Sequence, residues 1–374
     1  MERRPNCMNG GDGPTSYFQN SSHQRAGISA ATAFIQDGIA EELNLGVILH
    51  NNDVNTARNS FAIADLGCSV GPNTFLAAEA IIEAVRLKYY SKSSPAGTAA
   101  ALPEFQVFFN DQVGNDFNTL FRSLRPDAGY FAAGVAGSFH RRLFPKSSIH
   151  FVHSSYALPW LSRVPKEVRN ENSASWNKGR IFYTEAPGEV WTAYAAQYAE
   201  DLRSFLQARA EEVVIGGLMA LLFPFSQSEN SSDESRLSRL FNLLGSTLVD
   251  MAKRGEIEEE KVDSFNLPIY LPSSTEFKAL VEENGYFSVV RTEAMPPPVT
   301  GAVSEGFARA VRMNMRAANE GLISNHFGSQ VVDDLFEKYE KKLIVDSTSD
   351  LLENSTGEAT ELFVLLKRKL NSCH

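Results

Sequence analysis

The sequence predicts an α/β fold, in which buried parallel strands alternate with amphipathic helices and a group of helices caps the sheet. Two observations support this prediction. Two apolar runs each end at an acidic residue, as a buried strand does when its carboxyl end reaches the edge of the sheet. The run 61–64 is followed by Asp65, and the run 104–111 ends at Asp111. After residue 226 the pattern becomes mostly helical between returning strands, which favours a cap on the same sheet over an independent domain.

The remaining elements follow from hydrophobic periodicity and turn residues. His150 and His153 lie three apart on one expected strand, so they point to opposite faces and do not share a metal. We interpret them as one core histidine and one at the surface or behind the site. Further strands are expected over 130–137, 148–156, 213–225, 286–291 and 361–367, and helices over 20–45 (stopped by Gly46), 72–90, 115–121, 191–210, 237–254, 274–284 and 301–322.

The stretch 61–75 combines a buried strand, a turn of small residues and the start of a helix. Gly67 and Gly71 allow a sharp turn and a close approach of the backbone to a ligand. Ser69 stands where the middle glycine of a dinucleotide fingerprint would be, which disfavours a pyrophosphate and hence a nicotinamide dehydrogenase. The turn therefore favours an adenosyl group without a pyrophosphate, although taken alone it also fits a turn that binds nothing.

Asp65 and Asp111 both end expected strands. In open α/β sheets ligands bind at the carboxyl ends of the strands, so we expect the two carboxylates to face one crevice. A carboxylate there offers two acceptor oxygens for the two hydroxyls of a ribose. The alternative for Asp111 is an N-cap of the following helix.

The composition excludes several classes of function. The 374 residues carry a formal net charge of −10 and contain no basic block, which argues against a nucleic-acid partner. Three scattered cysteines predict neither a disulfide framework nor a thiolate zinc site. The longest apolar stretch, 213–225, is too short to span a membrane. The first residues lead into glycine and serine, so we expect no signal peptide and a cytoplasmic location.

Several short motifs, in order from about Met8 to Lys369, resemble those of the plant SABATH methyltransferases. That family includes salicylate, jasmonate, loganate and farnesoate carboxyl methyltransferases and the xanthine N-methyltransferases. The matching residues are Ser16-Tyr17, Asn20-Ser21 and Gln24; 65–69 and 71–73; 109–111 and 115–118; 137–139 and 142–145; and 153–156 and 160–162.

The resemblance implies an S-adenosylmethionine-dependent enzyme of plant specialised metabolism, usually a homodimer. It implies a Rossmann-like class I methyltransferase sheet with an α-helical cap. Residues 1–25 would form an N-terminal active-site segment and residues 26–374 the core. The cap would comprise about 157–200, 226–284 and 301–345.

The resemblance also implies roles for individual residues. Gln24 and Trp160 would hold the substrate carboxylate, and Tyr17, Tyr156, Pro159, Leu240, Phe241 and Met315 would complete the substrate pocket. The cofactor would contact Tyr17, Ser21, Asp65, Gly67, Cys68 and Asn73 at its methionine end, Asp111 at its ribose, Gln112, Ser138 and Phe139 at its adenine, and Ser155. Some members carry a cation, Mg²⁺, which here would lie near Asn177, Asp263, Phe265 and Asn266.

The expected reaction turns the carboxylate of a small terpenoid, iridoid or aromatic acid into its methyl ester. A carboxylic acid is already ionised at neutral pH, so transfer in line with the sulfonium methyl needs no general base. Orientation alone contributes about 7–11 kcal/mol to such a reaction. Cys68 is expected to line the pocket rather than act as a nucleophile.

The chain departs from the family pattern at three positions. Pro159 stands where His, Met or Gln is usual, Ala136 replaces a common proline, and His140 replaces the usual tyrosine. Pro159 weakens any assignment to loganate or jasmonate. Two alternatives stay open: N-methylation of a xanthine-like ring, which an apolar pocket disfavours, and a catalytically silent binder on the same fold.

Overall fold

The computed structural model describes residues 7–49, 60–92, 102–228, 235–297, 305–347 and 359–370. The described strands form one seven-stranded sheet in the order β3-β2-β1-β4-β5-β7-β6. β1 to β5 are parallel, whereas β7 runs antiparallel to both β5 and β6. Their bounds are β1 Ser60–Leu66, β2 Glu104–Asp111, β3 Phe131–Ala136, β4 Ile149–Ser155, β5 Val213–Pro224, β6 Phe287–Met295 and β7 Glu361–Arg368. The predicted α/β class is confirmed. Each of these strands overlaps a predicted segment, although β6 continues to Met295, beyond the predicted end at residue 291.

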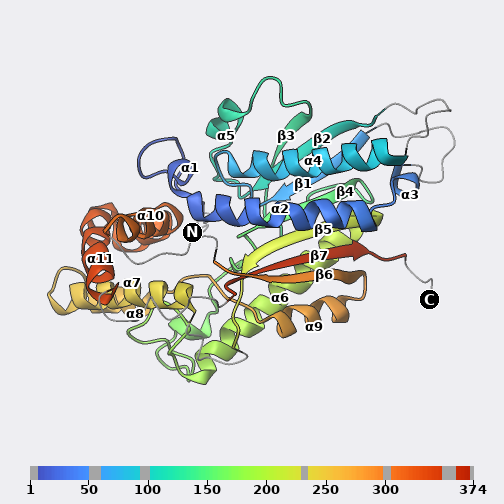
Figure 1. Cartoon of the computed structure of the whole chain (residues 1–374). Coiled ribbons are helices and arrows are strands. Elements are labelled where there is room, and N and C mark those ends of the chain that lie inside the picture. Colours follow the sequence, from blue (N-terminus) through green and yellow to red (C-terminus); the bar gives the residue numbers. More distant parts are fainter. Residues whose placement is uncertain are drawn as a thin grey trace.

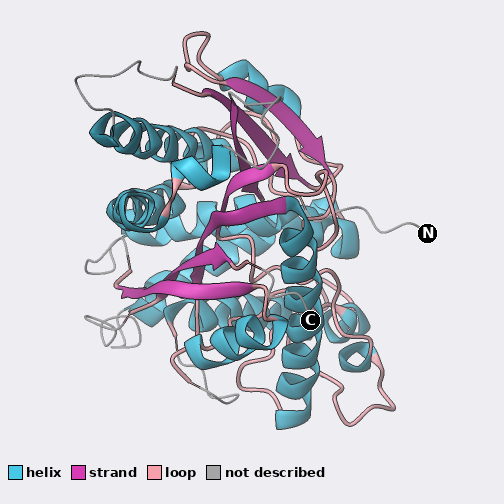
Figure 2. Ribbon diagram, turned by 90° about the vertical axis from the view of Figure 1, so that its right-hand side faces the viewer, coloured by secondary structure: helices cyan, strands magenta, loops and turns pink. Residues whose placement is uncertain are grey.

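Helices cover both faces of the sheet (Figures 1 and 2). α2 and α4 pack side by side on one face, while α6 and α9 lie on the other. α7, α8, α10 and α11 gather beside one end of the sheet (Figure 1). The bounds are α1 Tyr17–Asn20, α2 Ser22–Glu42, α3 Leu45–Leu49, α4 Asn73–Lys92, α5 Phe117–Ser123, α6 Gly188–Glu212, α7 Arg236–Lys253, α8 Glu259–Ser264, α9 Ser274–Asn284, α10 Glu305–Phe327 and α11 Val332–Ser347, with short 3₁₀ turns at Glu167–Arg169 and Ser329–Val331.

The buried strand β1 separates two hydrophobic cores. Phe61 and Ile63 pack into the core beneath α2 and α4, whereas Ala62 and Leu66 pack into the core on the opposite face. This alternation follows from the two-residue period of a strand. It explains why the run is apolar without interruption, since both faces of β1 are covered by helices.

The expected end of the first helix is wrong. α2 ends at Glu42, where Leu43 turns to an extended conformation. Gly46 lies inside the short helix α3 and does not stop α2. The Asn44 carboxamide oxygen accepts from the Gly46 amide at 3.1 Å, and this contact starts α3. The chain thus leaves the helical conformation at Leu43, one residue before the Asn44 side chain accepts from the backbone amide of Gly46.

Other differences concern helices and their ends. The sequence pattern does not predict α8 and α11 as separate helices, and both lie in the region of the predicted cap. Residues 301–304, at the start of the predicted helix 301–322, and residues 229–234 of the predicted cap lie outside the described residues. In the ranges that the structure describes, no helix is both long and apolar enough to cross a membrane.

Candidate active site

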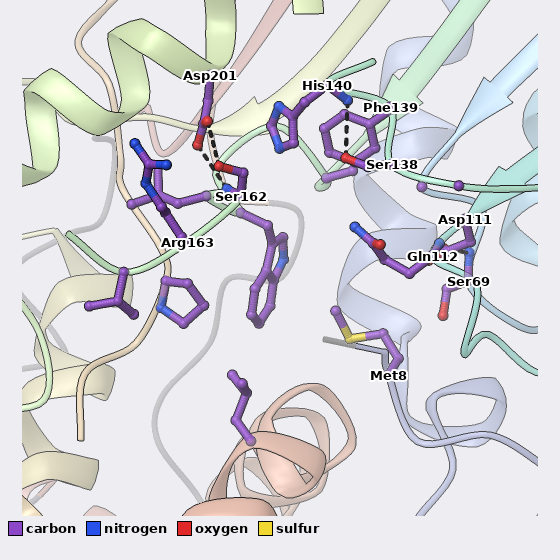
Figure 3. A pocket seen from close by; sticks show the side chains of 18 of the residues that line it. Met8, Ser69, Asp111, Gln112, Ser138, Phe139, His140, Ser162, Arg163 and Asp201 are labelled. Carbon is purple, nitrogen blue, oxygen red and sulfur yellow. Dashed lines mark hydrogen bonds between the residues drawn. The ribbon is translucent and has the colours of Figure 1, made fainter. Parts of the chain in front are cut away.

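A cavity of about 1310 Å³ lies at the carboxyl ends of the parallel strands. Its wall includes Gly67 after β1, Asp111 at the end of β2, Ser138 after β3 and Ser155 at the end of β4. Residues from the N-terminal segment, α6 and α10 complete the wall. This is the position at which parallel α/β sheets bind ligands. Figure 3 shows Met8, Asp111 and Gln112 on one side of the cavity, with Ser162, Arg163 and Asp201 opposite.

The turn after β1 is shaped by backbone constraints. Gly67 has a φ of +82°, and a Cβ on it would lie 2.4 Å from the Ala157 Cβ. Gly71 has a φ of +112° and approaches the backbone of Phe18 in α1. Both glycines are therefore needed for the chain to turn here. Ser69 also has a positive φ of 52°, and its backbone amide donates to Asp111 at the end of β2.

Asp111 is held in place by two backbone amides. Its Oδ2 accepts from the Ser69 amide and its Oδ1 from the Gln112 amide, both at 2.7 Å. Burial raises the pKa of Asp111 from 3.8 to about 6, and the two amides oppose that shift. The carboxylate is therefore ionised at pH 7, and each oxygen keeps a lone pair for a ligand hydroxyl. Asp116, not Asp111, is the N-cap of α5, so that alternative is wrong.

Asp65 does not line the cavity with Asp111. It is only 4% exposed, and its Oδ2 accepts from the Thr74 hydroxyl while Oδ1 lies 2.7 Å from His153 Nδ1. The expectation of two carboxylates facing one crevice is therefore correct for Asp111 only. A buried carboxylate requires such partners, and Asp65 finds them in α4 and β4. His150, on the other face of β4, accepts from the Ala62 amide.

The N-terminal segment is tied down over the cavity by α10. The Asn9 amide donates to the Ala317 carbonyl at 2.9 Å, and the Asn9 carbonyl accepts from the Tyr17 amide. Met8 and Tyr17 line the cavity. Burial raises the pKa of the Tyr17 phenol, which therefore stays protonated.

Three predicted cofactor residues lie behind the cavity wall. Asn73 Nδ2 donates to the Ser21 carbonyl at 3.1 Å and to its Oγ at 2.9 Å, which joins the start of α2 to α4. Cys68 is buried, and its surroundings raise the pKa of the thiol well above 9.0. The thiol is therefore protonated at neutral pH, which agrees with the expectation that it is not a nucleophile.

Trp160 is presented by a braced loop, 157–162. The Leu161 amide donates to the Pro268 carbonyl at 2.7 Å, and the Tyr270 amide donates to the Pro159 carbonyl at 2.9 Å. Trp160 lines the cavity and is half-buried, whereas Pro159 is buried behind it. Across the part of the chain that the structure describes, the indole N–H of Trp160 has no hydrogen-bond partner.

Asp201 anchors that loop, and it was not among the candidate residues predicted from the sequence. Its carboxylate accepts from the Ser162 amide at 2.8 Å and from the Ser162 hydroxyl at 2.6 Å (Figure 3). It also accepts from Gln197 at 3.0 Å. Because Asp201 lies in the middle of α6, nothing local in the sequence distinguishes it from other acidic residues of that helix.

Tyr156, which also lines the cavity, is fixed by residues from two other elements. Its hydroxyl donates to Glu361 Oε1 at 2.6 Å, and His23 Nε2 lies 3.1 Å from the same oxygen. Gly27 leaves room for this contact, since a Cβ there would lie 1.9 Å from the hydroxyl. Glu361 is 1% exposed, so the contact is shielded from water.

The remaining predicted substrate residues do not line the cavity. Gln24 lies at the contact between α2 and α10, where its Oε1 accepts from Asn314 Nδ2 at 2.9 Å. Leu240 is half-buried on α7, while Phe241 and Met315 are each 4% exposed, on α7 and α10. The cavity wall beyond Trp160 instead contains Leu161, Val164, Phe265, Pro268 and Leu322.

His140, one of the departures from the family pattern, lines the cavity beside Phe139. Burial lowers the pKa of its imidazole, so the ring is neutral at pH 7. Its Nδ1 is buried and makes no hydrogen bond to any described residue. The ring is therefore a polar feature of the wall with an unused hydrogen-bonding atom.

Two of the predicted cation-site residues contact each other directly. Asn177 Nδ2 donates to Asn266 Oδ1 at 2.8 Å, while Asp263 Oδ1 accepts from the Gly179 amide. Phe265 is buried against His326. Asn177 Oδ1 and Asn266 Nδ2 are buried without a partner among the described residues. The residues that the structure describes contain no cluster of three or more His, Cys, Asp or Glu side chains that could hold a metal ion. The cation site therefore stays a prediction.

The sequence matches one family model, described as SAM dependent carboxyl methyltransferase, over residues 3–369. Loganic acid O-methyltransferase of Catharanthus roseus is 43% identical, over 97% of this chain and 94% of that protein. Farnesoic acid carboxyl-O-methyltransferase of Arabidopsis thaliana is 42% identical, over 75% and 77% of the two chains. Paraxanthine methyltransferase 2 of the same plant is 38% identical, over 90% and 91%.

A solved structure of loganic acid methyltransferase with SAH superposes on this fold with a TM-score of 0.88. It is 42% identical, covering 98% of this chain and 100% of that chain. The resemblance to the SABATH methyltransferases is therefore confirmed. The chain belongs to the family of S-adenosylmethionine-dependent carboxyl methyltransferases.

Proposed function

We propose that this enzyme methylates the carboxylate of a small terpenoid, iridoid or aromatic plant acid. The observation that carries the proposal is Trp160, whose indole N–H faces no partner among the described residues and whose side chain lines the same cavity as Asp111. An indole N–H is a donor only, so it suits an anionic acceptor. The cavity thus combines a site for the adenosyl ribose with a site for a carboxylate.

The residues of the cavity fit the cofactor. S-adenosylmethionine supplies a methyl group on a positively charged sulfur. Asp111 would accept from the ribose hydroxyls, since both of its oxygens are oriented by backbone amides and keep free lone pairs. Gly67 lines the cavity, and Gln112, Ser138 and Phe139, which also line it, would flank the adenine.

Trp160 in the cavity wall, together with Gln24 at the contact between α2 and α10, would orient the acid. Each hydrogen bond to an ionised group contributes about 1.5–3 kcal/mol, which is enough to hold one carboxylate oxygen while the other attacks. The apolar side chains beyond Trp160 would contact the body of the acid and exclude water, which strengthens both hydrogen bonds. The protein then acts by placement and needs to move no proton.

A panel of acids with labelled S-adenosylmethionine tests the proposal, with methyl esters detected by mass spectrometry. Xanthines belong in the same panel, because paraxanthine methyltransferase 2 and a 3,7-dimethylxanthine N-methyltransferase are 38% and 35% identical to this chain. We expect esters, and we expect Trp160→Ala and Gln24→Ala to raise KM for the acid. A methylated purine with no ester from any acid would contradict the proposal, and turnover of any acceptor would exclude a silent binder.

Three further properties belong to the same proposal. The buried, unpartnered Asn177 Oδ1 is an oxygen of the type that Mg²⁺ prefers, and this supports a cation near Asn177, Asp263, Phe265 and Asn266. Metal content after dialysis against a chelator tests that site. The resemblance implies a homodimer, and a cytoplasmic location stays the expectation from the sequence. Sedimentation of the purified protein and imaging of a tagged protein in leaf cells test these two properties.

A further inference from the structure

One side chain of α10 contacts both the end of α1 and the start of α2. Asn314 Nδ2 donates to the Asn20 carbonyl at 2.7 Å and to Gln24 Oε1 at 2.9 Å. Asn314 is half-buried, and Met315, the next residue, is buried. The two hydrogens of one amide group are thus both used, and both point toward the N-terminal segment.

These two contacts fix the orientation of the Gln24 amide. The Asn20 partner is a backbone carbonyl, which accepts but never donates, so the group of Asn314 that faces it must be the NH₂. The same NH₂ faces the end of Gln24, and that end must therefore be the carbonyl oxygen Oε1. The Gln24 NH₂ then points away from Asn314 and makes no hydrogen bond within the described residues.

We propose that Asn314 is a positioning residue, which holds the Gln24 amide with its NH₂ toward the acid and thereby selects an anionic acceptor. This inference rests on the proposed function, in which Gln24 binds the carboxylate. The surroundings support it, because two residues that precede Gln24 line the cavity or contact its wall. Tyr17 precedes it in α1 and lines the cavity, and His23 contacts the ring of Tyr156, which also lines the cavity.

The substitution Asn314→Asp tests the orientation. A carboxylate at this position accepts only, so it would attract the Gln24 NH₂ and turn Oε1 toward the substrate carboxylate. Asn314→Ala removes the donor to Gln24 Oε1, so the Gln24 amide is no longer held in one orientation and is not forced into the opposite one. We therefore expect KM for the acid to rise about threefold in Asn314→Ala and about ten- to hundredfold in Asn314→Asp. kcat and the affinity for S-adenosylhomocysteine should stay within about twofold of the wild type.

Two controls separate positioning from a general effect on the helix. Asn319→Ser removes another amide of α10, one whose Nδ2 donates to the Met315 carbonyl within the helix. It reports, by its unfolding midpoint, what the loss of an α10 amide costs in stability. The second control repeats Asn314→Asp in a Gln24→Ala background, where no amide remains to be turned. The KM of that double variant should equal the KM of Gln24→Ala.

The outcomes distinguish the inference from the function on which it rests. An Asn314→Asp effect that disappears in the Gln24→Ala background supports the inference. An effect of equal size in both backgrounds, or an Asn314→Asp effect no larger than that of Asn314→Ala, overturns it while ester formation persists. If Asn314→Asp does not fold, the same comparison of backgrounds is made with Asn314→Ala. A wild-type enzyme that forms no ester overturns the proposed function, and the inference with it.

Discussion

The proposed cofactor half of the site (67–69, 111–112 and 138–139) and the proposed acceptor half (Gln24, Tyr156 and Trp160) are held in different ways. In the cofactor half, backbone amides and glycine conformations set the shape. Ser69 and Gln112 donate their amides to Asp111, and the positive φ of Gly67 turns the chain away from β1. Substitutions elsewhere in the protein change such a site little, because its geometry depends on the backbone.

In the acceptor half, each side chain is fixed by another side chain that lies far away in the sequence. Asp201 accepts from Ser162 in the loop of Trp160, Glu361 accepts from the Tyr156 hydroxyl, and Asn314 donates to Gln24. If these side chains bind the acceptor, we expect its specificity to depend also on residues that do not touch it.

The largest effect is expected in the cofactor half, for Asp111→Ala. The substitution removes the acceptor of the ribose hydroxyls, and each hydrogen bond to a charged group contributes about 1.5–3 kcal/mol. The Kd of S-adenosylhomocysteine, measured by calorimetry, should rise about a hundredfold or more. Asp127→Ala removes an exposed aspartate and is the matched control. Unchanged affinity in Asp111→Ala would show that the cofactor is held elsewhere.

In the acceptor half, Trp160→Phe should raise KM for the acid about tenfold and leave the Kd of S-adenosylhomocysteine unchanged. Phenylalanine keeps most of the aromatic surface and removes the indole N–H, so the substitution isolates the hydrogen bond to the carboxylate. Steady-state kinetics with the best acid of the panel measures this effect. Equal KM values for Trp160→Phe and the wild type would mean that the indole only fills space.

The binding of the cofactor should depend on pH through Asp111. Its pKa in the free protein is about 6, above the ordinary 3.8, because burial disfavours the ionised form. The ionised form is the one that accepts from both hydroxyls, so affinity for S-adenosylhomocysteine should fall about tenfold for each pH unit below 6. The free energy of unfolding of the ligand-free protein has the opposite dependence on pH. It falls as the pH rises through about 6, because the buried Asp111 then ionises in the folded state. In Asp111→Asn, the dependence of affinity on pH should disappear.

These differences explain what could be predicted from the sequence. The strands were predicted because the apolar run at 61–64 and the acid that follows it are local signals, and the turn at Gly67 and Ser69 lies within the same stretch. The position of Asp111 at the end of a strand predicted a ligand-binding carboxylate, and the resemblance to known methyltransferases assigned Trp160 to the substrate carboxylate. Both line the cavity in the structure.

The positioning contacts could not be predicted in this way. Asp201 and Glu361 matter because folding brings them to Ser162 and Tyr156, and no spacing in the sequence records that contact. Asp65 shows the converse. Its position at the end of a strand predicts that it faces the crevice. The Asp65 side chain instead points into the core, where it contacts His153 of the neighbouring strand β4. Whether an acidic residue at the end of a strand faces a ligand therefore depends on the side chains that neighbouring strands place beside it.

The smallest effect is expected for Asp201→Asn, which tests how the acceptor half is held. One asparagine oxygen can still accept from the Ser162 amide, but the new NH₂ cannot accept from the Ser162 hydroxyl or from Gln197. The loop 157–162 keeps its backbone contacts to Pro268 and Tyr270, so Trp160 should loosen rather than leave the cavity. We expect KM for the acid to rise about threefold, with kcat and cofactor affinity unchanged. Ser162→Ala removes one partner of the same contact and should give a similar rise. If the two substitutions together raise KM by the product of their separate effects, the contact between Ser162 and Asp201 does not position Trp160.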